Sequence, residues 1–203
     1  FLRNPICQEM GRKIKIAFSN TEEDTALAFI HDLGFIPKIK NGKRGFKIVV
    51  GGGLGAQPRM ADVATEFIEE DKLIPFTEAV LRVFDRNGER NSRSKARMKF
   101  LLTKIGFDAF MELVEAEKLA LKNQSVKVEY TSVAESKATK YYDGQELDSK
   151  EYILWKSTNV ISQSEKGLHG IYVKIPLGNI SSEESRQLIS KLEGYTDLGL
   201  WLP

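Results

Sequence analysis

The alternation of hydrophobic and polar positions near the start of the chain predicts a β-strand. Residues 13–18 have the sequence Lys-Ile-Lys-Ile-Ala-Phe, in which lysine and apolar side chains take turns. Because successive side chains of a strand point to opposite faces of a sheet, Lys13 and Lys15 would share one face. The opposite face, which we expect to be buried, would carry Ile14, Ile16 and Phe18.

Further along the chain, the pattern predicts a hairpin with helices on both sides of it. Two apolar strands at 35–40 and 43–50 are joined by Asn41-Gly42, the residue pair typical of a type I′ turn. Apolar residues recur at helical spacing before and after this hairpin. The expected helices span residues 26–33, 60–70, 75–87, 92–104 and 107–122. The mixture of strands and helices predicts an α+β fold.

A change in composition divides the chain. Residues 123–150 are polar and rich in Lys, Ser and Glu, which is typical of a connector between a first domain, 1–122, and a second, 151–203. The second domain is expected to contain two strands, 169–177 and 198–202. Between these strands, Ser181 and Glu184 form a capping box that predicts a helix, ended by Gly194.

Composition and charge exclude several classes of protein. The chain has 203 residues and a net charge of +2, too small to argue for nucleic acid or an anionic membrane, and no apolar run long enough to span a bilayer. Its one cysteine, Cys7, excludes a disulfide framework and fits a reducing, cytoplasmic setting. Cys7, His31 and His169 show no metal-ligand spacing. The chain begins at Phe1 without a signal peptide, so we expect a piece of a longer protein.

Four glycines follow the second hairpin strand within five positions: Gly51, Gly52, Gly53 and Gly55. Such a loop brings backbone N–H groups together and suits an anion or a cofactor. The spacing also fits a loose dinucleotide fingerprint, which makes a nucleotide-binding domain one hypothesis. Pro58 and Arg59 stand where the nucleotide-binding helix should continue, and the acidic residue that would bind a ribose is missing. A tight turn beside packed backbone is the better interpretation of the spacing alone.

Basic residues are the other candidates for chemistry. Lys13 and Lys15 fit either the solvated face of a strand or two ammonium groups aimed at one anion. Arg93 and Arg97, one turn apart on an expected helix, fit either an exposed polar face or a site for a ligand with several carboxylates or phosphates. These two arginines belong to a longer basic run: Arg82, Arg86, Arg90, Arg93, Lys95, Arg97 and Lys99.

Several ordered motifs resemble the sirohaem-dependent nitrite and sulfite reductase family. The motif Arg-Lys-Ile-Lys-Ile-Ala-Phe-Ser is similar to the lysine strand of that family, and Trp-Lys-Ser-Thr-Asn is similar to the opening of its ferredoxin-like half-domain. The quoted segments are residues 12–19, 31–35, 45–55, 88–99 and 155–159, with Gln163 and Gly167. The resemblance implies a mixed sheet with helices over 1–122, followed by a partial ferredoxin-like half-domain.

The resemblance also implies a function and a set of site residues. The reaction would be the six-electron reduction of nitrite to ammonia or of sulfite to sulfide, with electrons from ferredoxin or a flavoprotein. Lys13 and Lys15 fall on the active-site lysines of the family and would neutralise the anion and supply protons. Arg97, assisted by Arg93 and Lys99, would bind carboxylates of sirohaem. The loop glycines Gly51, Gly52, Gly53 and Gly55 would pack against the macrocycle and offer it their N–H groups.

The chain departs from the family in ways that shape the expectation. The four cysteines that hold the 4Fe-4S cluster in the family are absent, and so are its upstream arginines. The chain alone is therefore expected to be inactive, and a non-catalytic module that binds an anion or cofactor is the alternative. An incomplete half-domain would leave an open sheet edge through which two copies could pair.

Overall fold

The computed structural model describes residues 1, 4–8, 10–129, 149–163 and 168–193. The chain divides into two compact units, 1–130 and 131–203, and each is described by itself. Most of the polar segment expected as a connector, and the strand expected at 198–202, lie outside the described residues. Among the helices described, none has the length and the apolar character needed to cross a membrane.

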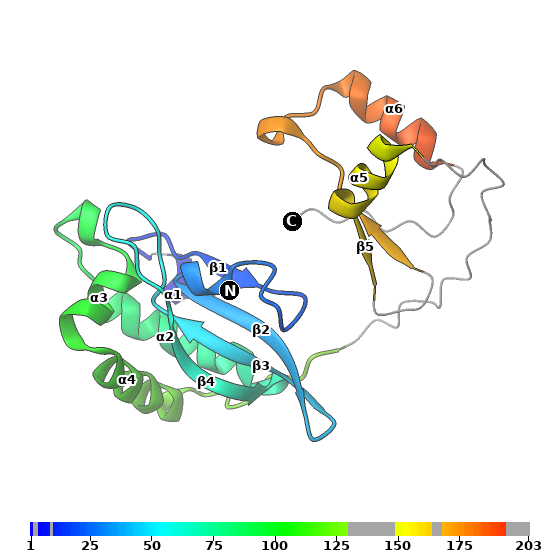
Figure 1. The fold of residues 1–203 in the computed structure, drawn as a ribbon. Coiled ribbons are helices and arrows are strands. Elements are labelled where there is room, and N and C mark those ends of the chain that lie inside the picture. The colour runs from blue at the N-terminus through cyan, green and yellow to red at the C-terminus, as the bar shows by residue number, and fades with distance from the viewer. Residues whose placement is uncertain (2–3, 9, 130–148, 164–167, 194–203) are drawn as a thin grey trace. The chain divides into compact units, whose positions relative to one another are not determined.

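A four-stranded mixed sheet forms the centre of the first unit (Figure 1). The strands lie in the order β1-β2-β3-β4; β1 runs parallel to β2, and the remaining neighbours are antiparallel. Their bounds are Ile16–Phe18 for β1, Leu33–Lys40 for β2, Lys43–Val50 for β3 and Asp62–Glu69 for β4. The β2–β3 hairpin confirms the predicted turn, since Asn41 and Gly42 both have the positive φ, 53° and 74°, that a type I′ turn requires.

Helices cover one face of this sheet (Figure 1). The core there packs β2 and β3 side chains such as Phe35 and Ile48 against Phe84, Leu102 and Phe110 of the helices, all five of them buried. The helical segments of the first unit are α1 (Pro5–Gln8), η1 (Ala28–Ile30), η2 (Glu70–Lys72), α2 (Leu73–Asn87), η3 (Arg93–Lys95), α3 (Met98–Ile105) and α4 (Phe107–Ala120). On the other face, a small cluster forms around Ala28 of η1.

The prediction that Ile16 and Phe18 are buried is wrong. Ile16 is 40% and Phe18 57% exposed, whereas Ala17, on the opposite face, is 8% exposed. β1 lies at the edge of the sheet, so its side chains on the helical side are only partly covered. Phe18 is left stacked on Phe35, with the ring centroids 4.6 Å apart.

Three predicted helices are also corrected. Residues 26–33 form only the single turn η1, because the Asp24 carboxylate accepts hydrogen bonds from Ser19 Oγ (2.6 Å) and the Ala28 N–H (2.7 Å) and closes a local turn. Residues 62–69 of the second predicted helix are strand β4, which pairs with β3. The helix expected at 92–104 is broken into η3 and α3.

The second unit contains helix α5 (Lys150–Asn159), strands β5 (Val160–Ser162) and β6 (His169–Ile171), η4 (Pro176–Gly178) and α6 (Ser182–Leu192). β6 is shorter than the strand predicted over 169–177. The capping box of Ser181 with Glu184 is confirmed at the start of α6. No described side chain of this unit is buried, and Leu154 and Ile171 are more than half exposed.

Candidate functional site

The glycine loop between β3 and β4 is held by its own backbone hydrogen bonds. The Gly51 N–H donates to the Asp32 carbonyl (2.8 Å), and the Gly52 N–H donates to the His31 carbonyl (2.9 Å). Gly53 and Arg59 exchange two backbone hydrogen bonds of 2.9 Å across the loop. The expectation that these N–H groups are available to a cofactor is therefore wrong for Gly51, Gly52 and Gly53.

Two of the glycines are required for different reasons. A Cβ on Gly52 would lie 2.3 Å from the Phe29 carbonyl oxygen, so this position admits no side chain without a backbone shift. Gly55 has a φ of +98°, which L side chains rarely adopt, and a Cβ there would meet nothing within 4 Å. Gly51, Gly52 and Gly53 are buried and Gly55 is exposed, so Gly55 is the glycine of the loop that an outside group could approach.

Lys99, on α3, holds the loop from inside. Its Nζ donates to the carbonyl oxygens of Leu54 (2.8 Å) and Gln57 (2.5 Å), and the residue is only 5% exposed. A buried ammonium group needs such acceptors. Burying an uncharged polar group without a hydrogen-bond partner costs on the order of 2–7 kcal/mol, and burying a charge without one costs more. Arg59 supports the same loop by donating from Nη1 to the Gly51 carbonyl (3.0 Å).

A buried carboxylate, Asp32, joins the other parts of the site. It is 0% exposed and accepts two bonds from Arg97, Nε to Oδ1 (3.0 Å) and Nη2 to Oδ2 (2.6 Å). The backbone N–H of Lys15 donates to Oδ2 as well (2.8 Å). With the Gly51 bond to its carbonyl, Asp32 links the lysine segment, the glycine loop and the start of α3.

Sequence reasoning missed Asp32. The only signal was its position, an acidic residue directly before the buried strand β2, inside a segment that carries the family resemblance.

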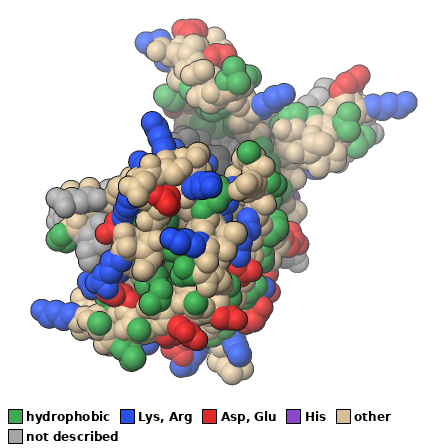
Figure 2. Space-filling view, turned by 90° about the vertical axis from the view of Figure 1, so that its left-hand side faces the viewer, with side chains coloured by type: hydrophobic (Ala, Val, Ile, Leu, Met, Phe, Trp, Pro, Cys, Tyr) green, Lys and Arg blue, Asp and Glu red, His purple; other side chains and the backbone are tan. Residues whose placement is uncertain are grey.

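Three of the expected site residues present free cationic groups. Lys13, Lys15 and Arg93 are exposed, and none of their side chains is bonded to another described residue. Lys13 and Lys15 lie just before β1, because the strand predicted over 13–18 begins only at Ile16, and Arg93 lies in η3. Figure 2 shows the side of the first unit that carries α3 and α4, with Lys and Arg side chains standing over the upper part of that face.

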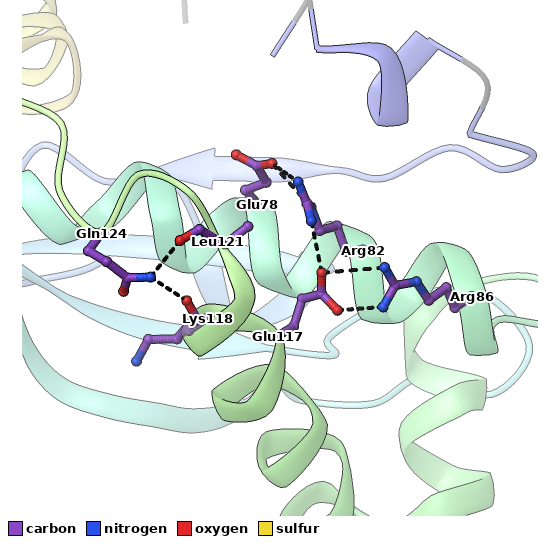
Figure 3. Close-up of polar contacts among 7 residues, drawn as sticks. All are labelled: Glu78, Arg82, Arg86, Glu117, Lys118, Leu121 and Gln124. Atoms are coloured by element: carbon purple, nitrogen blue, oxygen red, sulfur yellow. Dashed lines mark hydrogen bonds and ion pairs between the residues drawn. The ribbon is translucent and has the colours of Figure 1, made fainter.

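Two earlier arginines of the basic run, Arg82 and Arg86, bind acidic side chains of the helices (Figure 3). On α2, Arg82 bonds to Glu78 (2.7 Å) and to Glu117 (3.0 Å), and Arg86 bonds to Glu117 (2.5 Å) on α4. Burial works to lower the pKa of Arg82, but the bonds to Glu117 and Glu78 outweigh it and leave that pKa raised. Arg90 pairs with Asp85. Arg82, Arg86 and Arg90 are thus paired with carboxylates, whereas Arg93 is bonded to no other described residue.

Comparison with known proteins decides the family. The model of the family described as nitrite and sulphite reductase 4Fe-4S domain matches residues 1–122, more than half of the chain. The chain belongs to this family. That membership confirms the resemblance seen in the sequence, and the mixed sheet with its helices confirms the α+β fold class.

Individual relatives agree with this membership. The chain is 34% identical over 115 residues to the sulfite reductase [NADPH] hemoprotein beta-component of Chromohalobacter salexigens, over 53% of this chain and 20% of that protein. It is 25% identical over 198 residues to the chloroplastic ferredoxin–nitrite reductase of Oryza sativa subsp. japonica, over 96% of this chain and 30% of that protein. The solved structure of the Mycobacterium tuberculosis NirA protein matches with a TM-score of 0.52 and 30% identity, over 61% of this chain and 22% of that one. The chain thus spans 20% to 30% of the length of these relatives.

Proposed function

We propose that the chain forms part of the anion and sirohaem site of a reductase that converts nitrite to ammonia or sulfite to sulfide with six electrons. Lys13 and Lys15 carry this proposal, because their ammonium groups are exposed and unpaired among the described residues. They stand on a segment bonded to Asp32, and the Asp32 carbonyl holds the glycine loop. Two cations at one point would attract a small oxyanion and could each give it a proton as its oxygens leave as water.

The residues fit sirohaem in part. Its carboxylates need cationic donors, and Arg93 is exposed and bonded to no other described residue, while Arg97 retains Nη1 as a donor that does not bond to Asp32. We propose that these two arginines bind sirohaem carboxylates and that the exposed backbone at Gly55 packs against the ring. Lys99 and the buried glycines Gly51, Gly52 and Gly53 would not touch the ring, but they would hold the loop that carries Gly55 in place. When bound, sirohaem supplies the iron that holds the anion and passes electrons to it.

The residues do not fit a 4Fe-4S cluster. The family resemblance implies four cysteine ligands, and this chain contains one cysteine, Cys7. Among the described residues, no three His, Cys, Asp or Glu side chains come together as metal ligands would. We derive no step of the reaction from a cluster held by this chain.

Partners and setting belong to the same proposal. The names of the relatives, ferredoxin–nitrite reductase and NADPH sulfite reductase hemoprotein, support a ferredoxin or a flavoprotein as electron donor and nitrite or sulfite as substrate. A cytoplasmic location fits the single cysteine. Two copies pairing through the edge of the β5–β6 sheet would elute from gel filtration at twice the mass of the chain, and elution as a monomer would contradict that pairing.

Binding of sulfite to the sirohaem-loaded chain tests the role of the lysines. Sulfite affinity is read from the visible absorption of sirohaem, with K13Q, K15Q and the double variant compared with the unaltered chain. Each lost ammonium should raise the Kd about 5- to 10-fold, the effect of about 1 kcal/mol of Coulomb energy near water. The control is K43Q, because Lys43 is exposed but bonds to Glu69 at the hairpin end. An unchanged Kd in the double variant, or a chain that binds no sirohaem, would contradict the proposal.

The single cysteine favours a second candidate, a non-catalytic module that binds the anion and the cofactor. An anaerobic assay with reduced methyl viologen separates the two functions. Turnover of sulfite or nitrite by the loaded chain would exclude the second candidate. Sulfite binding without turnover would favour it.

A further inference from the structure

We propose that Asp32 is a positioning residue for the two lysines. Its carboxylate, held by Arg97, fixes the backbone at Lys15 and thereby sets where Lys13 and Lys15 contact the anion. This inference rests on the proposed function of Lys13 and Lys15. It assigns to Asp32 and Arg97 a role in the reaction without direct contact with the anion.

Three donors surround the Asp32 carboxylate. Arg97 presents Nε and Nη2 to the two oxygens of Asp32 in a fork, and the Lys15 N–H completes the set. Because Asp32 is 0% exposed, these donors replace the water that a carboxylate would otherwise bind. A charge this deeply buried tolerates little displacement of its partners, so the geometry at Lys15 is tightly defined.

The segment that carries the two lysines depends on the Asp32 carboxylate for one of its attachments. Lys13 and Lys15 precede β1 and lie outside the ladder of the sheet, which begins with the pair Ile16 and Leu33. Lys15 is held there at both ends, since its carbonyl accepts from the Leu33 N–H (3.2 Å) and its own N–H donates to Asp32. Without the Asp32 carboxylate, the Lys15 N–H loses its partner, and the segment before β1 is held on one side only.

The glycine loop is bonded to Asp32 and to its neighbour His31. The Asp32 carbonyl accepts the Gly51 N–H (2.8 Å) and the neighbouring His31 carbonyl accepts the Gly52 N–H (2.9 Å). One two-residue segment therefore sets the position of the loop and of the lysines together. Arg97, which also starts α3, fixes that segment relative to the helices.

A matched control is available on the helical side of the molecule. Glu117 is also a buried carboxylate, 8% exposed, and is bonded to two arginines, Arg82 and Arg86. None of its hydrogen bonds or ion pairs joins it to the lysine segment or the glycine loop. A variant E117Q thus removes a buried charge of the same kind without touching the proposed site.

The first measurement uses the chain without cofactor. Backbone amide exchange at Lys15, followed by NMR, should become at least about tenfold faster in D32N than in the unaltered chain, because the acceptor of this N–H is weakened. E117Q should leave exchange at Lys15 unchanged. Unchanged exchange at Lys15 in D32N, or an equal increase in E117Q, would overturn the inference. If D32N does not fold, R97K carries the same test, since it keeps the positive charge and loses the fork.

The second measurement uses the sirohaem-loaded chain. D32N should raise the Kd for sulfite about 5- to 10-fold, with E117Q unchanged, and D32N should add little to the K13Q/K15Q double variant because all three act through the same lysines. An additive effect in the triple variant would overturn the inference. If K13Q/K15Q leaves the sulfite affinity unaltered, the proposed function fails, whereas exchange at Lys15 still decides whether Asp32 positions this segment.

Discussion

Two buried carboxylates of this chain are each bonded to arginine, and they differ in what they hold together. Glu117 joins two helices, accepting from Arg82 and Arg86 of α2 (Figure 3). Asp32 joins a strand, a loop and the start of a helix, and one of its three donors is the backbone N–H of Lys15. The same chemistry therefore stabilises helix packing in one region and holds the segment that carries the proposed lysines in the other.

The two networks also differ in exposure. The Arg86 side chain is 64% exposed, whereas those of Arg82 and Arg97 are 24% and 26% exposed, so Arg86 can be solvated if Glu117 is lost. Asp32 is fully enclosed, and it depends on its partners entirely. This difference predicts that breaking the two networks lowers the free energy of unfolding by different amounts.

The largest effect is expected for Arg97→Met. It leaves Asp32 as a buried charge with one remaining donor, a situation that costs about 3–5 kcal/mol of unfolding free energy. Urea denaturation followed by circular dichroism measures this cost. The control is R93M, whose side chain is bonded to no described residue and which should stay within about 0.5 kcal/mol of the unaltered chain. If R97M were as stable as R93M, Asp32 would not depend on Arg97, and the proposed difference between the two networks would be contradicted.

A smaller effect is expected for Glu117→Gln. The amide keeps the shape of the side chain and an acceptor oxygen, and the exposed Arg86 side chain can turn to solvent, so we expect a loss of about 1–2 kcal/mol. The same urea experiment measures it. If E117Q lowered the free energy of unfolding as much as R97M does, burial of the carboxylate alone would set the cost. Access of its partners to water would then have no effect.

The Asp32 network also marks where prediction from the sequence ends. The hairpin was predictable because Asn41-Gly42 sets its turn locally, and α6 because Ser181 and Glu184 cap it within one turn. Asp32 and Arg97 are 65 positions apart, and no local pattern announces such a pair.

Burial at the sheet edge was unpredictable for the same reason. Alternation in the sequence separates the two faces of β1 correctly, since Ile16 and Phe18 lie opposite Ala17. It does not say how far the helices extend over the face that carries Ile16 and Phe18, and here they leave Phe18 more than half exposed. The proposed site could be located in outline because the segments that carry Lys13, Lys15 and the glycines resemble motifs of a known family. The hydrogen bonds that occupy the N–H groups of the loop could be found only from the fold.

The smallest effect concerns a half-buried carboxylate, Glu89, which holds the turn before Arg93. It accepts hydrogen bonds from the backbone N–H groups of Asn91 (2.6 Å) and Ser92 (3.1 Å), and these bonds lower its pKa. Because the folded-state pKa is depressed, the stabilisation is present above the ordinary pKa of glutamate. It is lost as the pH falls through the folded-state value.

NMR titration of the Asn91 and Ser92 amide resonances should therefore show a transition below the ordinary glutamate pKa, and E89Q should abolish it. E112Q, which changes an exposed glutamate of α4, is the control and should leave the transition in place. Water can bind to Glu89 but cannot reach Asp32. Loss of the Glu89 charge should therefore loosen one turn and leave amide exchange at Lys15 unchanged. A change at Lys15 in E89Q would show that the two carboxylates are coupled, and that the site is set by the 89–97 segment as a whole and not by Asp32 and Arg97.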